Sequence, residues 1–228
     1  MLAKGVAPEQ DGYAICPPMF SQAELHGLTA ELAAAPLQRT RAGARHILGC
    51  SSIARLAKDS RLIDLASRWL GAAAVPFKAT LFDKSPDANW LVAWHQDTAL
   101  PISEHRDVAG WGPWSEKSGV TYAHAPAHVL EQVIALRVHL DDSTPDNGPL
   151  RVLPRTHTAG VLSDAEIHEL SLRVKPVSCP VPAGGIVVMR PLIIHASSKL
   201  NAPSPRRVLH LEYAASLALE SGLELRVA

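Results

Sequence analysis

The stretch Ile134-Ala-Leu-Arg-Val-His-Leu140 indicates the fold class of this 228-residue chain. Apolar residues occupy every second position, and successive side chains of a β-strand point to opposite faces of a sheet. The segment is therefore expected to be a strand with one buried face. Other strand-like segments cover residues 77–83, 90–94, 172–181, 186–189, 192–195 and 208–213, and glycine- and proline-rich turns such as Asp146-Asn-Gly-Pro149 separate them.

The first 75 residues have a different, helical pattern. Ser21 and Glu24 have the spacing of a capping box before a helix over residues 22–35. A second helix is expected to begin at Asp59 or Ser60 and to end at Gly71, and a short one near Ser163. We expect one domain over residues 1–228, in which a helical prelude (1–75) packs outside a mainly antiparallel β core (76–214), a sandwich or jelly roll.

One connection, residues 98–127, is too long for a simple turn. It has no clear period and carries Trp111 and Trp114. Connections of this length are usually functional, so we expect a partly mobile lid that excludes water from a reactive centre. The alternative is a packed surface loop.

Composition excludes several classes of protein. The 22 Lys and Arg residues balance 22 Asp and Glu residues, so the basic excess of a nucleic-acid-binding protein is missing. No apolar run approaches the about 18 residues of a membrane span, and residues 1–13 are too polar for a secretory signal. Cys16, Cys50 and Cys179 are far apart and form no CxxC pair, which is typical of free thiols. We expect a cytoplasmic protein that acts on a small molecule, with no nucleic-acid or membrane partner. Its oligomeric state is left open.

Three His-x-Asp triplets are candidate metal sites: His95-Gln-Asp97, His105-Arg-Asp107 and His139-Leu-Asp141. Residues i and i+2 of a strand point the same way and can offer an imidazole and a carboxylate to one ion. With a third ligand they form the two-His-one-carboxylate face of Fe(II) enzymes. The first triplet is favoured because it ends an apolar strand and opens the long 98–127 segment. The second lies in a polar loop, the third at a solvated strand exit, and Pro126 argues against a helical zinc pair of His124 and His128.

His195 is the candidate third ligand. It lies in the otherwise apolar Ile193-Ile-His-Ala-Ser197, where a hydrogen-bonded core histidine is the alternative. A symmetric turn near residues 200–201 would place Arg206 across from His195, on the same face of an antiparallel pair, and Arg207 on the other face. An arginine there could clamp the far carboxylate of a chelator that reaches inward from the metal. A slip of one residue in the turn would exchange the two arginines.

From residue 76 to 213 the chain resembles the phytanoyl-CoA dioxygenase family of Fe(II)- and 2-oxoglutarate-dependent oxygenases. The order and spacing of seven short pieces carry this resemblance: Thr80-Leu-Phe-Asp-Lys84, Asn89-Trp-Leu-Val-Ala-Trp-His-Gln-Asp97, Arg137-Val-His-Leu-Asp-Asp142, Asn147-Gly-Pro-Leu-Arg-Val-Leu-Pro154, Pro182-Ala-Gly-Gly185, Pro191-Leu-Ile-Ile-His-Ala-Ser-Ser198 and Arg206-Arg-Val-Leu-His210. The resemblance implies a double-stranded β-helix. It also implies a dioxygenase that uses Fe(II), 2-oxoglutarate and O2 to hydroxylate a small molecule.

The resemblance also implies roles for individual residues. The metal ligands map to His95, Asp97 and His195, and the arginine for the 2-oxoglutarate C5 carboxylate maps to Arg206. The further cosubstrate or pocket contacts that it implies are Ser197, one of Lys78 and Thr80, and Trp114. Asp97 favours hydroxylation, because related halogenases have a small residue at that position. The chain departs from its relatives at Pro154-Arg-Thr-His157, in a loop outside the metal site.

Two alternatives remain open at this point. One is a cupin-like isomerase or hydrolase that uses another metal without 2-oxoglutarate, and Arg206 argues against it. The other is a non-catalytic metal- or small-molecule-binding protein on the same fold, which would be expected to have lost a ligand. The substrate is left undefined, and residues 98–127 are expected to determine it.

Overall fold

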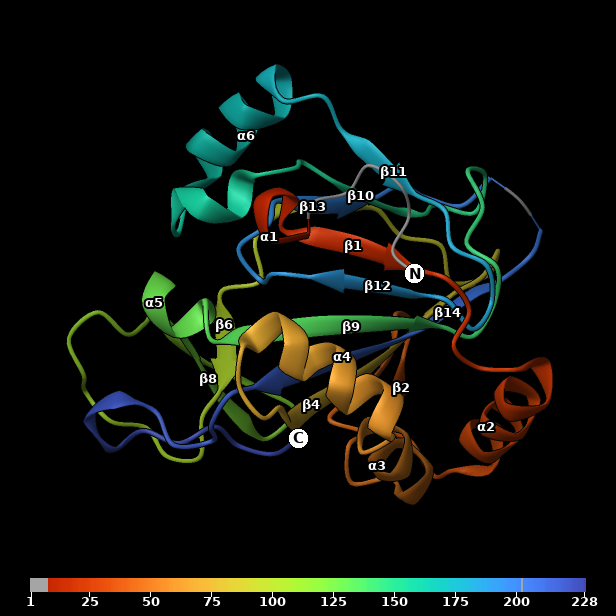
Figure 1. Cartoon of the computed structure of the whole chain (residues 1–228), viewed down its shortest axis with the longest axis horizontal. Coiled ribbons are helices and arrows are strands. Elements are labelled where there is room, and N and C mark those ends of the chain that lie inside the picture. The colour runs from red at the N-terminus through yellow and green to blue at the C-terminus, as the bar shows by residue number, and fades with distance from the viewer. Residues whose placement is uncertain (1–7, 202) are drawn as a thin grey trace.

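The computed structural model describes residues 8–201 and 203–228, and its core consists of two facing β-sheets (Figure 1). The larger sheet has seven strands in the order β1-β12-β9-β14-β4-β3-β2. These are Tyr13–Cys16, Ile186–Met189, Val133–His139, Arg206–Ala214, Val75–Lys84, Gly43–Arg45 and Arg39–Thr40. The smaller sheet has the order β11-β10-β13-β5, with strands Val177–Cys179, Leu150–Val152, His195–Ser197 and Val92–His95. All the pairings within both sheets are antiparallel, as the sequence predicts.

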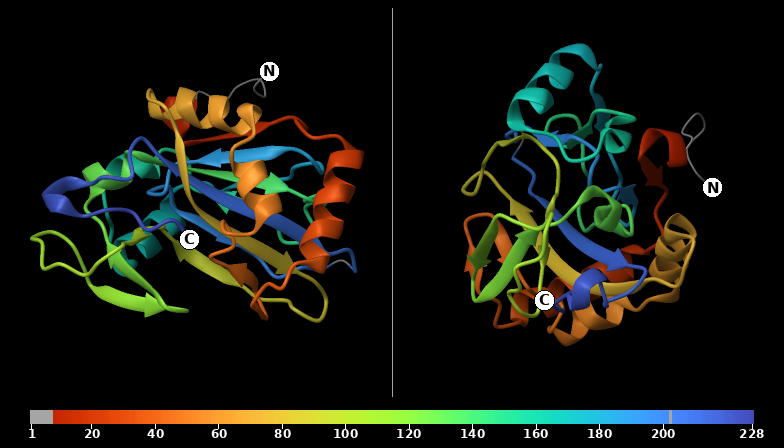
Figure 2. Two further views of the ribbon diagram at one scale, coloured as in Figure 1. Left: turned by 90° about the horizontal axis from the view of Figure 1, so that it is seen from below. Right: turned by 90° about the vertical axis from the view of Figure 1, so that its left-hand side faces the viewer.

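Strand alternation divides the large sheet into an apolar face and a polar face. Leu136 and Val138 of β9 pack with Leu209 and Leu211 of β14 in the main hydrophobic cluster. Helices α2 (Gln22–Ala34), α3 (Ser51–Ala57) and α4 (Ser60–Leu70) contribute the other side of this cluster, along one face of the sheet (Figures 1 and 2). The intervening residues of β9 and β14 face the second sheet, and they include the buried polar residues Arg137, His139, Arg206, His210 and Glu212.

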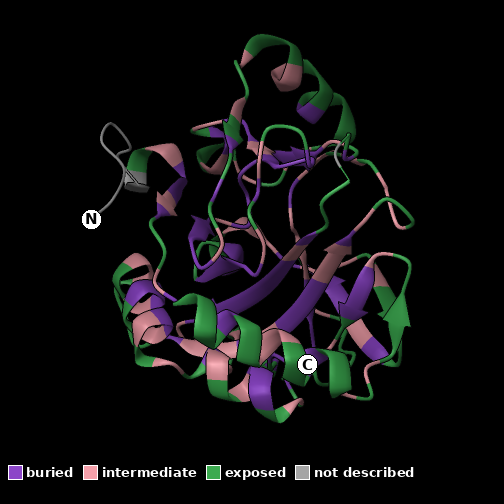
Figure 3. Cartoon of the chain, turned by 90° about the vertical axis from the view of Figure 1, so that its right-hand side faces the viewer, coloured by how far each residue is buried: buried purple, intermediate pink, exposed green. Residues whose placement is uncertain are grey.

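The predicted helix ends are confirmed. Ser21 and Glu24 form the capping box of α2, and Ser163 and Glu166 form that of α6 (Asp164–Arg173). Gly71 ends α4 in the left-handed conformation that glycine adopts at low cost, at φ 67°. Helix α6 covers the smaller sheet, where Ile167 packs with Ile194 and Leu153. Figure 3 shows the buried central strands and the exposed outer sides of the helices.

The prediction of a purely helical prelude is wrong. Strand β1 pairs with β12 at one edge of the large sheet, and β3 pairs with β4 toward the other. These strands have only four and three residues, too few for a clear alternating pattern. Short helices α1 (Pro8–Asp11) and α5 (Ala127–Leu130), and 3-10 turns Thr156–Ala159 and Glu220–Gly222, complete the described elements.

The segment 98–127 is more ordered than the sequence predicts. It forms a third sheet, β6-β8-β7, from Ala99–Pro101, Val120–His124 and Trp114–Lys117. Leu100 and Ala123 pack with Leu223 and Leu225 from the C-terminal region in a separate apolar cluster. These strands have three to five residues and are separated by polar turns, so the sequence shows no clear alternating pattern for them. That the segment closes over a substrate stays a prediction.

The predicted pairing of Arg206 with His195 is wrong. His195 opens β13 of the smaller sheet, whereas Arg206 opens β14 of the larger sheet and lies opposite Lys84 of β4. The chain between them crosses from one sheet to the other and does not fold back as a hairpin. Both residues line the cavity between the sheets, but they are not neighbours in one antiparallel pair.

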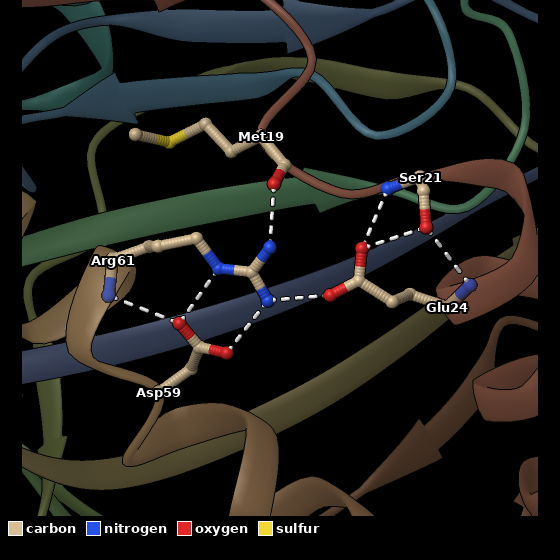
Figure 4. A network of polar contacts seen from close by, with 5 residues as sticks. All are labelled: Met19, Ser21, Glu24, Asp59 and Arg61. Atoms are coloured by element: carbon tan, nitrogen blue, oxygen red, sulfur yellow. Dashed lines mark hydrogen bonds and ion pairs between the residues drawn. The ribbon is translucent and has the colours of Figure 1, made fainter.

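An arginine network connects the helices on the outer face (Figure 4). Arg61 of α4 donates to both carboxylate oxygens of Asp59, to Glu24 of α2 and to the carbonyl oxygen of Met19. These hydrogen bonds with Arg61, and those from Ser21, lower the pKa of Glu24 to about 2. The network thus links the start of α4 to the start of α2.

Three sequence expectations bear on compartment. Within the described residues, no helix has both the length and the apolar character needed to cross a membrane. The three cysteines are free thiols, as predicted. The expectation about a secretory signal falls largely on residues 1–7, outside the described range.

Tyr213→Phe is expected to lower the free energy of unfolding by about 1–2 kcal/mol. The buried Tyr213 hydroxyl donates to the carbonyl oxygen of Ala57 at 3.0 Å and so joins β14 to α3. Urea denaturation followed by far-UV circular dichroism measures the change. Tyr13→Phe is the control, because the Tyr13 hydroxyl makes no hydrogen bond within residues 8–201 and 203–228. Equal losses in the two variants would contradict the assignment.

Candidate metal centre

The antiparallel pairing of β5 with β13 brings two histidines together. His95 ends β5, His195 opens β13, and the two residues are direct partners in the register, with ring centroids 4.2 Å apart. Asp97 follows two residues after His95. Its carboxylate oxygens lie 3.5 Å from Nε2 of His95 and 3.4 Å from Nε2 of His195. The ligand atoms all lie within 4.8 Å of one another, and this is the one such group of three in the described part of the chain.

Hydrogen bonds set the orientation of both imidazoles. Nδ1 of His95 lies 2.8 Å from the carbonyl oxygen of Ala93, and Nδ1 of His195 lies 2.9 Å from that of Ile193. A carbonyl oxygen only accepts, so each Nδ1 must carry the proton. Each Nε2 then presents its lone pair toward Asp97, which is the usual arrangement of metal-binding histidines.

The charge states of His195 and Asp97 also fit a divalent cation. Burial lowers the pKa of His195 to about 4, so this imidazole is neutral at neutral pH. Burial alone would raise the pKa of Asp97, but His195 and His95 lower it well below its usual value. At His95 burial alone would lower the pKa, but the hydrogen bond and charge of Asp97 outweigh burial and raise the pKa, so a bound metal would displace a proton there. A neutral imidazole and an ionised carboxylate are the forms that bind a metal. The residues present therefore fit an Fe(II) ion.

Gln96, between two of the ligands, holds the end of β5 in place. Its amide nitrogen donates to the carbonyl oxygens of Gly160 and Leu192 at 2.9 and 2.7 Å, and its oxygen accepts from the backbone N–H of Leu162 at 2.9 Å. Gln96 was not predicted as a site residue. The sequence offers one indication of its role, its position inside the His-x-Asp triplet.

The competing histidines do not form a group of three ligands within the described residues. His105 and Asp107 are exposed, and Asp141 is bound by Arg207. His139 is fully buried inside the barrel, and burial lowers its pKa well below the usual value. The side chain of His124 bonds to Thr98 and that of His128 to Glu220.

A cavity of about 480 Å³ extends from the three ligands between the sheets and reaches Arg206. Arg206 is buried, and it donates from Nε to the carbonyl oxygen of Asn147 at 3.2 Å and from Nη2 to Ser197 Oγ at 3.1 Å. Its Nη1 is buried without a partner within the described residues. A guanidinium held at two nitrogens and open at the third suits a carboxylate that enters the cavity.

The turn at Gly148 supports this arginine. Gly148 has a φ of 67°, and a Cβ there would lie 2.3 Å from the carbonyl oxygen of Ser198. Only glycine lets the backbone of this turn approach Ser198 so closely. The turn then places the carbonyl oxygen of Asn147 where it accepts from Arg206, and that of Gly148 where it accepts from Ser197 Oγ. The Asn-Gly turn of the sequence thus positions the cationic end of the cavity.

Lys84 lies beside Arg206 and was not predicted as a site residue. It is buried opposite Arg206 in the β4–β14 register and donates from Nζ to Ser197 Oγ at 2.9 Å and to the carbonyl oxygen of Ser198 at 2.6 Å. Burial, with Arg206 and Arg137 nearby, lowers its pKa to about 7. The cavity end therefore holds two cationic groups and one hydroxyl.

Of the remaining predicted contacts, two line the cavity and one does not. Lys78 and Thr80 both line the cavity, and Lys78 pairs with the buried Glu212 at 2.6 Å. The prediction that Trp114 lines the pocket is wrong. Strand alternation puts it on the face opposite Lys117, where it packs against the second apolar cluster and His105, and Tyr122 lines the cavity from the neighbouring strand.

Comparisons with known proteins find similar sequences and folds. The chain is 26% identical over 209 residues to L-proline trans-4-hydroxylase from Streptomyces griseoviridis, covering 78% of this chain and 69% of that protein. The structure of EctD from S. alaskensis with 2-oxoglutarate and 5-hydroxyectoine has a TM-score of 0.69 and 24% identity, over 92% of this chain and 74% of that one. The structure of the epimerase SnoN with Fe3+, alpha ketoglutarate and nogalamycin RO also has a TM-score of 0.69, with 21% identity, over 96% of this chain and 83% of that one.

The two similar structures establish the double-stranded β-helix fold. The family is shown by a separate match over most of the chain. The sequence profile of phytanoyl-CoA dioxygenase matches residues 9–208. The predicted class, a dioxygenase dependent on Fe(II) and 2-oxoglutarate, is that of this family. The chain therefore belongs to the phytanoyl-CoA dioxygenase family.

Proposed function

We propose that the protein hydroxylates a small molecule at an Fe(II) ion bound by His95, Asp97 and His195, with 2-oxoglutarate bound by Arg206. The observation that carries this proposal is one cavity that joins a three-ligand metal face to a buried arginine with an unpartnered nitrogen. The hydroxylase from Streptomyces griseoviridis supports a small amino acid as the first substrate to test. The free thiols support the cytoplasm as the compartment.

When bound, Fe(II) with 2-oxoglutarate and O2 supplies the oxidant that replaces a substrate C–H hydrogen by a hydroxyl group. The protein side chains supply binding and orientation. Three protein ligands on one face would leave coordination positions open for the cosubstrate and O2, and Asp97 would fill the position that halogenases leave open for a halide. Arg206, with Ser197 and Lys84, holds the distal carboxylate of the cosubstrate.

A cupin-like hydrolase or isomerase is less well supported. Such an enzyme would have no use for a buried guanidinium that points an unpartnered nitrogen along the cavity. A non-catalytic binding protein is also less well supported, because all three ligands are present and oriented.

Asp97→Ala is expected to abolish iron-dependent conversion of 2-oxoglutarate to succinate, because it removes the anionic ligand. Succinate formation and Fe(II) content are measured on the purified variant, and circular dichroism checks the fold. Asp107→Ala is the control, since Asp107 belongs to an exposed His-x-Asp triplet outside the cavity. An Asp97→Ala variant with wild-type turnover would place the metal elsewhere.

Arg206→Ala is expected to weaken 2-oxoglutarate binding about 30- to 3,000-fold, the effect of about 2–5 kcal/mol for losing one partner of a buried charge pair. Anaerobic titration of the Fe(II)–2-oxoglutarate charge-transfer absorbance measures the affinity. Arg207→Ala is the matched control, because Arg207 bonds to Asp141 outside the cavity. If Arg207→Ala loses the cosubstrate and Arg206→Ala keeps it, the assignment of the clamp is wrong.

The affinity for 2-oxoglutarate is expected to fall as the pH rises above about 7. Lys84 has a pKa of about 7 in the cosubstrate-free protein, lowered by burial and by Arg206 and Arg137. The dianion favours protonated Lys84, so binding above this pH takes up a proton, and the affinity drops by up to about tenfold per pH unit. Lys84→Met should bind more weakly at low pH and lose this dependence. The same charge-transfer titration across pH measures both, and an unchanged slope in Lys84→Met would contradict the role of Lys84.

A further inference from the structure

The cavity has more positive charge than the metal and cosubstrate account for. Among the described residues, six lysine and arginine side chains line the cavity, but only one carboxylate does, that of Asp97. The basic residues are Arg45, Lys78, Lys84, Lys117, Arg137 and Arg206. Glu212 neutralises Lys78, and the charges of Fe(II) and the 2-oxoglutarate dianion cancel each other. A cationic excess therefore remains when both are bound.

Arg137 is a buried cation of this excess, and no carboxylate pairs with it within the described residues. It is 6% exposed, and its guanidinium lies over the ring of Phe82 at 5.2 Å and donates from Nη1 to Nδ1 of the neutral His210 at 3.1 Å. Its Nε is buried without a partner, and no carboxylate lies within 4 Å of it among residues 8–201 and 203–228. Burial lowers its pKa only to about 10, so the group stays charged at neutral pH. Burying an uncompensated charge is costly, which points to a ligand that provides the anion.

The position of Arg137 differs from that of the cosubstrate clamp. Arg137 lies opposite His210 in the β9–β14 register, and Arg206 lies four residues earlier on β14, opposite Lys84. At about 3.3 Å per residue these positions are about 13 Å apart along the strand. Arg137 and the metal-ligand candidates Asp97, His95 and His195 lie near enough for their charges to affect one another. The charge of Arg206 acts instead on Lys84, His139 and Arg137. Arg137 is thus at the metal end of the cavity, and Arg206 is at the far end.

Two further cations lie at the metal end, toward the third sheet. Lys117 of β7 lies over the ring of Tyr122 at 4.8 Å, and burial, with Arg45 and Lys78 nearby, lowers the pKa of Lys117. Arg45 comes from β3 of the large sheet. Cations of one sign around a cavity raise the local concentration of an anionic ligand.

We propose that the substrate to be hydroxylated carries a carboxylate and that Arg137 binds it. This proposal rests on the function proposed above and specifies its substrate class. Arg45 and Lys117 attract the anion toward the cavity. The carboxylate held at Arg137 fixes the substrate beside the metal, at a point separate from the cosubstrate carboxylate at Arg206.

The test compares carboxylates with their uncharged amides. L-proline, L-pipecolate, benzoate and hexanoate, each with its carboxamide, are titrated anaerobically into the Fe(II)–2-oxoglutarate complex, and the shift of the charge-transfer band reports binding near the metal. At least one carboxylate is expected to bind about 10- to 100-fold more tightly than its amide, the effect of one charge-assisted hydrogen-bonding contact. Arg137→Gln should remove this preference and leave the affinity for 2-oxoglutarate within about twofold of wild type.

Arg151→Gln is the matched control. Arg151 also lies over an aromatic ring, that of Trp94, and has a buried Nε without a partner within the described residues, but it does not line the cavity. It should keep the preference for carboxylates. Arg137→Lys keeps the positive charge and should therefore retain part of the preference for carboxylates. This variant distinguishes loss of the charge from a folding defect in Arg137→Gln.

The outcomes separate this proposal from the proposed function. If the Fe(II)–2-oxoglutarate band does not form in the wild type, the proposed function fails first. If the band forms and no carboxylate of the panel binds better than its amide, the carboxylate-bearing substrate is excluded. If Arg137→Gln weakens 2-oxoglutarate itself, Arg137 belongs to the cosubstrate site, and the proposal is overturned.

Discussion

The pairing of His95 with His195 across strands β5 and β13 is the constraint on which the site depends. Because the two residues are direct partners in an antiparallel register, their rings lie side by side, and Asp97 can reach both. The carbonyl oxygens of Ala93 and Ile193 then orient the rings so that both lone pairs point to one place. A shift of one residue in this register would move one imidazole to the other face of its sheet.

The large sheet supplies the other half of the chemistry. Its outward residues form an ordinary apolar core with the helices, whereas its inward residues form rows of polar groups along β4, β9 and β14. Arg206 and Lys84 occupy one row, and His210, Thr80 and Arg137 occupy another. Burying cations without compensating anions is costly, and this supports the proposal that the cavity takes ligands that carry negative charge.

The sequence predicts the fold class and the grouping of His95, Asp97 and His195 for physical reasons. Strict alternation over residues 134–140 defines β9, and the capping boxes define α2 and α6. His95 and Asp97 share a face by spacing alone. Lys84 and Arg137 were missed because each is an isolated basic residue at a polar position of a strand, and such positions usually face solvent. Only the second sheet shows that they face a cavity.

The errors have a common origin in long-range geometry. The Arg206 argument assumed that consecutive strands pair, but in a double-stranded β-helix the chain alternates between sheets. The short strands of residues 99–124 carry too few residues for a period. Trp114 is placed in the pocket by the family resemblance, and strand alternation turns its side chain away from the cavity.

One measurement tests the central claim most directly: anomalous diffraction at the iron edge from crystals grown anaerobically with Fe(II) and 2-oxoglutarate. The account predicts one iron peak per chain within bonding distance of His95, Asp97 and His195, and a dicarboxylate that extends from it to Arg206. An iron peak at another cluster, or a dicarboxylate whose far end lies away from Arg206, would contradict it.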